Sequence, residues 1–121
     1  DKVVLDMGSG TGVLAILAEQ LGARAVDAID IDEWAFENAK ENIDRNAVSN
    51  IQCFQGGAEL LSGKMYDVIL ANINRNILLT DMVHYSNALV ADGIILFSGF
   101  YSQDIPLLIE EGSKHGLQEV S

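Results

Sequence analysis

The sequence predicts an α/β fold of the doubly wound type, in which helices cover both faces of a mostly parallel sheet. Three observations favour this class. Short apolar runs alternate with segments of helical periodicity, which is the order of βαβ units. A glycine-rich turn joins the first apolar run to the first helical segment. The hydrophobic fraction of 49% suits strands that are buried on both faces. We therefore expect one domain over residues 1–121, with the strand order 3-2-1-4-5.

The expected strands are apolar runs that end at polar residues or glycine. They span residues 2–7, 25–31, 50–55, 66–72 and 94–99. Asp92-Gly93 is predicted to form the turn into the last of these strands. Residues 117–121 are typical of a sixth strand that is cut short. We therefore expect the final strands of the sheet to be truncated.

Helical periodicity fills the segments between the strands. The expected helices span residues 12–21, 33–46, 76–89 and 104–116. Gly22 would end the first helix and Asp32 would cap the second. The residues predicted to face the core are Val13, Leu14, Ile16, Leu17 and Leu21 in the first helix, and Trp34, Ala35, Ala39 and Ile43 in the second.

Charge and composition narrow the possible functions. Eighteen acidic residues against seven Lys and Arg give a net charge of -11, which disfavours direct nucleic-acid binding and is compatible with a basic protein partner. We see no apolar run long enough for a membrane span and no signal peptide, and the single Cys53 cannot form an internal disulfide. We expect a cytoplasmic protein, and a chain starting at Asp1 indicates a piece of something longer.

The glycine-rich turn reads D-x-G-x-G-x-G from Asp6 to Gly12. Glycine permits positive φ and leaves room for a ligand against the backbone. A dinucleotide fingerprint would have its third glycine at Val13, and it would avoid a carboxylate close to the phosphates. Asp6 suits a ligand that carries an ammonium group and a positive sulfur. The alternative is a tight turn that binds nothing.

Further candidates follow the other strands. Asp30 ends the second strand, where a carboxylate can accept hydrogen bonds from both hydroxyls of a ribose. Its structural alternative is to cap a loop. His84 and His115 have no partner at ligand spacing, so no metal site is indicated.

Four segments together resemble class I S-adenosylmethionine-dependent methyltransferases, which have a Rossmann-like fold. Among these, the chain is most similar to the methyltransferase of large-subunit ribosomal protein eleven, the PrmA family. The segments are residues 4–14, 28–32, 36–39 and 67–73, and residues 96–100 extend the similarity to nearly the whole chain. The resemblance implies that the chain is most of a catalytic domain, with a separate N-terminal domain docking the ribosomal protein.

The resemblance also implies a binding site for S-adenosylmethionine. Asp6, Gly8 and Gly10 would line the methionine and ribose end, and Asp30 would accept from the ribose hydroxyls. Many of these enzymes have an acid after the third strand that accepts from the adenine amino group. This chain has Gly57 there, so main-chain groups around Gly57 and Ala58 would hold the adenine, with Glu59 as a possible substitute.

Asn72 ends the fourth strand, where these methyltransferases place the group that faces both cofactor and methyl acceptor. Its side-chain carbonyl would orient an incoming amine for in-line attack on the methyl group. Other interpretations stay open: a methyltransferase for another protein, an RNA or a small molecule; a dinucleotide-dependent oxidoreductase; or a cofactor-binding fragment without activity.

Overall fold

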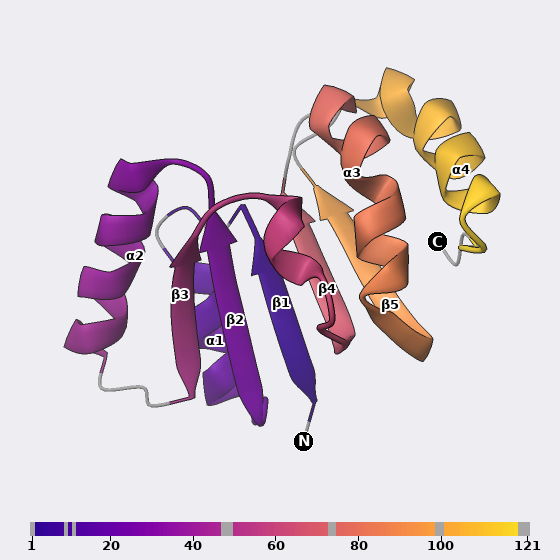
Figure 1. Ribbon diagram of the computed structural model, residues 1–121. Coiled ribbons are helices and arrows are strands. Elements are labelled where there is room, and N and C mark those ends of the chain that lie inside the picture. The colour runs from indigo at the N-terminus through magenta and orange to yellow at the C-terminus, as the bar shows by residue number, and fades with distance from the viewer. Residues whose placement is uncertain are drawn as a thin grey trace.

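The computed structural model describes residues 2–8, 10, 12–46, 50–72, 75–98 and 101–118. Within this part, five strands form one parallel sheet in the order β3-β2-β1-β4-β5, with helices on both faces (Figure 1). The predicted fold class and strand order are confirmed. No helix of the described residues is long and apolar enough to cross a membrane.

The first strand of the chain is the central strand of the sheet. The strands are β1 (Val3–Met7), β2 (Ala25–Asp30), β3 (Ile51–Gln55), β4 (Tyr66–Asn72) and β5 (Leu89–Ser98). Because β1 pairs with β2 on one side and β4 on the other, Met7 lies between Ile29 and Ala71. The carboxyl ends of these three strands therefore meet at one edge of the sheet, where doubly wound folds bind their ligands.

Two groups of helices flank the sheet. They are α1 (Val13–Gln20), α2 (Glu33–Arg45), α3 (Arg75–Asn87) and α4 (Ile105–Lys114), with the short 3-10 helices η1 (Ala58–Leu61) and η2 (Ser102–Asp104). On one face α1 packs against β1, β2 and α2, whereas η1, α3 and α4 lie on the other (Figure 1). The side chain of Asp32 accepts hydrogen bonds from Trp34 and Ala35, which confirms it as the α2 cap.

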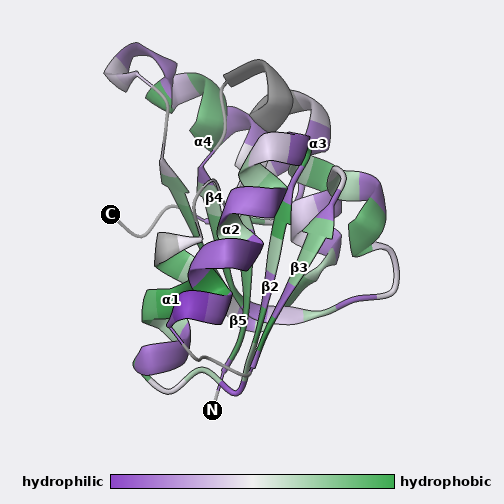
Figure 2. Cartoon of the chain, turned by 90° about the vertical axis from the view of Figure 1, so that its left-hand side faces the viewer, coloured by the Kyte–Doolittle hydropathy of each residue, from purple (hydrophilic) through white to green (hydrophobic). Residues whose placement is uncertain are grey.

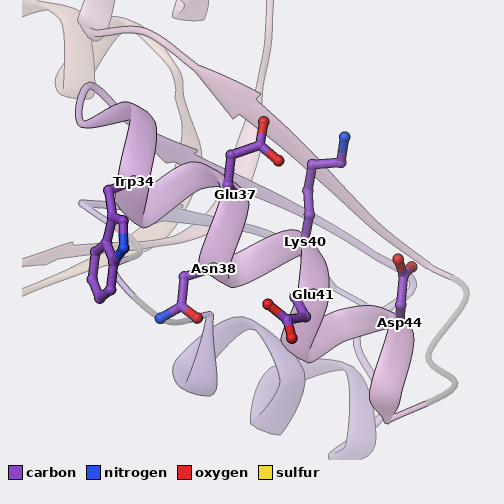
Figure 3. Close-up of a pocket in the computed structure, with 6 residues that line it drawn as sticks. All are labelled: Trp34, Glu37, Asn38, Lys40, Glu41 and Asp44. Atoms are coloured by element: carbon purple, nitrogen blue, oxygen red, sulfur yellow. The ribbon is translucent and has the colours of Figure 1, made fainter.

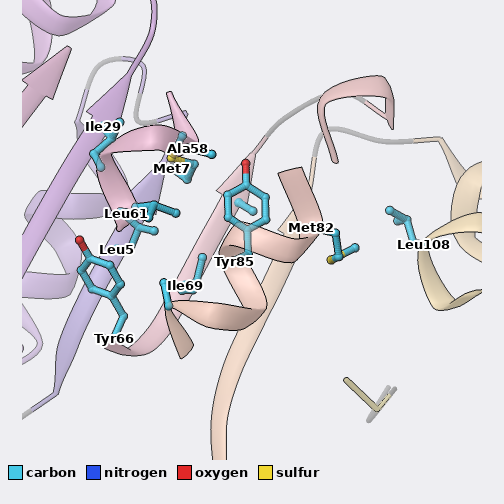
Figure 4. Packing of buried hydrophobic residues seen from close by; sticks show 12 residues of the cluster. Leu5, Met7, Ile29, Ala58, Leu61, Tyr66, Ile69, Met82, Tyr85 and Leu108 are labelled. Carbon is cyan, nitrogen blue, oxygen red and sulfur yellow. The ribbon is translucent and has the colours of Figure 1, made fainter. Parts of the chain in front are cut away.

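Strand alternation divides the core between the two faces. Val4 and Ala15 belong to the smaller cluster under α1, together with Val26 and Ala28. The larger cluster lies under η1 and α3 (Figure 4), and it includes Leu5, Met7, Ile29, Tyr66, Ile69, Met82 and Tyr85. Alternation along β1 therefore places Asp6 on the α1 face of the sheet.

The predicted inward stripe of α1 is wrong in part. Ile16 is buried, but Leu14, Leu17 and Leu21 are 44%, 47% and 79% exposed, and the buried position falls on Ala15. This helix is apolar on nearly every side, so periodicity cannot select its inner face.

In α2 the prediction holds for Ala35, Ala39 and Ile43, which are buried, but not for Trp34, which is 73% exposed. Figure 2 shows the outer side of α2 as largely hydrophilic, with the more hydrophobic strands beneath it. The inner positions are filled by alanine, which lets the helix approach the sheet and α1 closely.

The start of β5 differs from the prediction. The strand begins at Leu89 and runs through Asp92-Gly93, where only an entering turn was expected. Its register against β4 shifts between the pairs Tyr66–Leu89 and Val68–Ile94, and Asp92 has a positive φ of 67°. The turn signal is therefore an irregularity inside a paired strand. Of the expected sixth strand, residues 119–121 lie outside the described residues.

Candidate functional site

The glycine loop adopts the backbone that its sequence predicts. Gly8, Gly10 and Gly12 have φ of 77°, 57° and 81°, in the left-handed region that other residues rarely adopt. The N–H of Gly8 donates to the carbonyl of Ile29 at 2.8 Å, which holds the loop against the end of β2. A Cβ at Gly10 would meet nothing within 4 Å, so the loop leaves open space at that point.

Asp30 connects the loops that follow three strands. Its Oδ2 accepts from the N–H of Gly10 and its Oδ1 from the N–H of Asp32, both at 2.9 Å. Its main-chain carbonyl accepts from Gly56 at 2.9 Å. Asp30 therefore does cap a loop, as its structural alternative predicted. The same bonds hold its carboxylate directly at the glycine loop. Because a carboxylate has about four acceptor positions, this one can still accept from further donors.

Asp6 is a buried carboxylate beneath the same loop. It is 1% exposed, and neither oxygen has a hydrogen-bond partner among the described residues. Burial raises its pKa to about 6; the N–H of Ala15 in the first turn of α1 lowers the pKa, and the charge of Asp30 raises it further. An unpaired buried carboxylate is costly, which indicates a use beyond packing.

The end of β3 gives less support to the predicted adenine contacts. The N–H of Gly57 donates to Glu59 Oε1 at 3.0 Å, and this bond lowers the pKa of Glu59. Glu59 therefore caps the start of η1. The side chain of Ala58 packs into the large core cluster, so Ala58 could contact a ligand only through its main chain.

Asn72 lies at the same edge of the sheet as the glycine loop. It is the exposed last residue of β4, it pairs with Ser98, and the preceding Ala71 pairs with Met7. The structure therefore brings together the predicted residues on β1, β2 and β4. Residues 73 and 74, which follow Asn72, lie outside the described residues.

Sequence reasoning did not single out Ile31, an isoleucine between two acids. It follows Asp30 directly and is 73% exposed. The sequence signal that could have identified Ile31 is an apolar side chain directly after Asp30, the ribose-binding candidate. A hollow of about 450 Å³ lies elsewhere, along the outer side of α2 (Figure 3). It is lined by Trp34, Glu37, Asn38, Lys40, Glu41 and Asp44.

None of these six residues is a predicted site residue. They belong to one helix and form an open, charged face, so we place the site at the glycine loop. In the part of the chain that the structure describes, no group of three His, Cys, Asp or Glu side chains could hold a metal ion.

The strand order and the acidic glycine loop are those of Rossmann-like methyltransferases. A solved ribosomal protein L11 methylase from Lactobacillus delbrueckii subsp. bulgaricus matches with a TM-score of 0.88 and 30% identity, covering 99% of this chain and 65% of that one. The Trypanosoma brucei PRMT1 enzyme-prozyme complex with AdoHcy matches with a TM-score of 0.67 and 25% identity, covering 78% of this chain and 32% of that one.

The family is shown by sequence. The family model for ribosomal protein L11 methyltransferase (PrmA) matches residues 1–120, and the chain belongs to this family. A ribosomal protein L11 methyltransferase from Phocaeicola vulgatus is 52% identical over 120 residues, which are 98% of this chain and 43% of that protein. The chain thus spans less than half the length of that relative.

Proposed function

We propose that residues 1–121 form the S-adenosylmethionine-binding domain of an enzyme that methylates amino groups of ribosomal protein L11. The observation that carries this proposal is the pair of carboxylates at the glycine loop, Asp6 beneath it and Asp30 bonded to Gly10. Membership of the family and the AdoHcy in the PRMT1 neighbour support it.

The residues at this edge fit the cofactor. Asp30 would accept from the ribose hydroxyls while it keeps its bond to Gly10, and the bare backbone at Gly10 allows close approach. The unpaired charge of Asp6 would offset the positive charges of the methionine end. Ile31 would offer an exposed apolar surface for the adenine ring. Main-chain groups of Gly57 and Ala58 would contact the edge of that ring if Gly57 gives up its hydrogen bond to Glu59.

Methyl transfer from a sulfonium needs an acceptor lone pair in line with the methyl–sulfur bond; the bound cofactor supplies the methyl group. Asn72 would hold the acceptor through its side-chain carbonyl, which accepts a hydrogen of the neutral amine. The described His84 and His115 lie on α3 and just after α4, His84 being exposed, so we propose no side-chain base among them. The amine would lose its proton to water, and positioning would supply the catalysis.

The substrate partner that we propose is a basic ribosomal protein, and the compartment is the cytoplasm. A net charge of -11 favours the approach of a basic protein. A docking domain in the remaining part of the longer protein would supply further recognition. We expect no direct contact with nucleic acid or membrane.

The cofactor assignment is tested by calorimetry on the full-length protein with S-adenosylmethionine and with NAD. We expect binding of the first only. Asp30→Ala should weaken that binding by about 1.5–3 kcal/mol, because hydrogen bonds to a charged acceptor are lost.

Asp44→Ala, an exposed acid on α2, is the matched control for charge and should bind normally. Thermal unfolding of Asp30→Ala shows whether the weaker cofactor binding comes with a loss of protein stability. Binding of NAD without the sulfonium would favour an oxidoreductase and contradict the proposal.

The acceptor assignment is tested with Asn72→Ala in the full-length protein. We expect a drop in single-turnover methyl transfer on the order of a hundredfold, because the acceptor loses its orientation. The dissociation constant of S-adenosylhomocysteine should change much less. An unchanged transfer rate would remove Asn72 from the catalytic role.

A further inference from the structure

Two side chains in the described part of the chain carry buried polar atoms without a hydrogen-bond partner, Asp6 and Tyr85. Asp6 belongs to the cofactor site. Tyr85 lies on α3, on the other face of the sheet, and its side chain is fully buried. Native proteins satisfy nearly all such groups, so each exception needs a reason.

The Tyr85 hydroxyl points toward the carboxyl end of β4. Since α3 begins soon after β4 ends, its N-terminus lies at the carboxyl edge of the sheet, and helical side chains lean toward the N-terminus. In Figure 4 the oxygen of Tyr85 lies at the height of Met7 and Ala58, and Tyr85 shares its core cluster with Met7 and Ala71. Asn72, the last residue of β4, follows Ala71 directly. Tyr85 therefore belongs to the part of the core that underlies the strand end with the proposed acceptor-binding residue.

The surroundings of this hydroxyl leave it a donor without an acceptor. The cluster members on this side of the core are apolar: Met7, Ala58, Ala71 and Met82. Burial, with the nearby charge of Asp81, raises the pKa of Tyr85, so the phenol keeps its proton at neutral pH.

Tyr66 offers a contrast within the same cluster. Its buried hydroxyl donates to Asp27 Oδ2 at 2.6 Å. This core thus provides an acceptor for one tyrosine and none for the other.

We propose that Tyr85 is a positioning residue for methyl transfer, whose hydroxyl donates to a main-chain carbonyl at the end of β4 and thereby fixes Asn72 as the acceptor docks. The inference rests on the proposed function. We propose a main-chain carbonyl as the acceptor because the cluster members around Tyr85 are apolar. Because the hydroxyl is fully buried, it acts through the strand and does not touch the substrate.

The test compares Tyr85→Phe with Tyr66→Phe in the full-length protein, since each removes one buried hydroxyl from the same cluster. For Tyr85→Phe we expect a melting temperature equal to or above that of the wild type, because no bond of the resting protein is lost. Its kcat for methylation of ribosomal protein L11 should fall about tenfold or more, with the dissociation constant of S-adenosylhomocysteine within about twofold. Tyr66→Phe should lower the melting temperature and leave kcat unchanged.

The outcomes separate the two proposals. No methyl transfer by the wild type would overturn the proposed function itself. An active wild type with an unchanged kcat in Tyr85→Phe would overturn only the role of Tyr85. A lowered melting temperature in Tyr85→Phe, matching that of Tyr66→Phe, would show that the hydroxyl already has a partner, and the proposal would then be wrong.

Discussion

Asp6 is a buried carboxylate with no hydrogen-bond partner among the described residues. Its pKa of about 6 lies above the ordinary 3.8, so the native protein binds this proton more tightly than the unfolded chain does. The contribution of Asp6 to the free energy of unfolding therefore falls as the pH rises from about 4 to about 6, and it stays low above that. The negative charge under the glycine loop therefore lowers the free energy of unfolding at neutral pH.

Asp6→Asn should remove this pH dependence. We expect the variant to be more stable than the wild type at pH 8, by an amount on the order of 2–3 kcal/mol, with the difference shrinking toward pH 4. Urea unfolding at several pH values measures it. Asp44→Asn, at an exposed position, should follow the wild-type profile. A constant offset between Asp6→Asn and the wild type would show that Asp6 does not titrate in this range.

At the scale of single residues, the sequence predicted where a residue lies in the fold better than it predicted which groups that residue contacts. Asp30 was predicted from its place after the second strand, and the structure puts it at the loop. Its bond to Gly10 crosses twenty positions of the chain, so only the assembled fold reveals it. The missing partner of the Tyr85 hydroxyl is likewise a property of the packed core. The sequence does not show that the hydroxyl of Tyr85 is buried without a partner.

At the scale of elements, the glycine loop packs closely against α2 at Gly12. Gly12 caps α1, and a Cβ there would lie 3.2 Å from the Cβ of Ala39. Gly12→Ala should therefore combine the cost of a left-handed backbone, about 1–2 kcal/mol, with a steric contact that the alanine of α2 cannot relieve.

Gly10→Ala provides the control, because its Cβ meets nothing within 4 Å. We expect denaturant unfolding to show the larger loss of stability for Gly12→Ala. A loss no larger than that of Gly10→Ala would mean that α2 shifts to accept the added methyl group.

Element prediction succeeded where one physical signal dominated. The bounds of β4 match the expected residues 66–72, because an apolar run there ends at a polar residue. The prediction of element bounds was wrong where one segment could extend either a helix or a strand. Leu89 continued the periodicity of a helix but pairs with Tyr66, and that pairing depends on a strand far back in the chain.

For the whole molecule, the sheet leaves apolar surface uncovered on the α1 face of β5. Ile94 and Leu96 are 55% and 57% exposed, and β5 is an edge strand of the described sheet. The 121 residues also cover only 43% of the Phocaeicola vulgatus relative. The proposed site residues lie at or after the ends of β1, β2, β3 and β4, and none of them lies on β5.

We predict that residues 1–121 alone bind S-adenosylmethionine but methylate ribosomal protein L11 far more slowly than the full-length protein. The docking domain that we propose would be absent, so its binding energy would not raise the rate, and the exposed edge would favour association between copies. Mass spectrometry of the ribosomal protein after incubation with each form measures the added methyl groups. Comparable methylation by both would show that these residues suffice for substrate recognition.

The central place of β1 has a consequence for synthesis on the ribosome. Of the five strands β1 is made first, and its partner β2 follows within about twenty residues, but β4 begins only at Tyr66. Until then one side of the most buried strand has no neighbour, and β2, β3, α1 and α2 can assemble only half of the sheet. The nascent chain therefore carries an open central edge until β4 has been made. Asn72, the proposed acceptor-binding residue, joins that edge only with β4, after β1, β2 and β3 have been made.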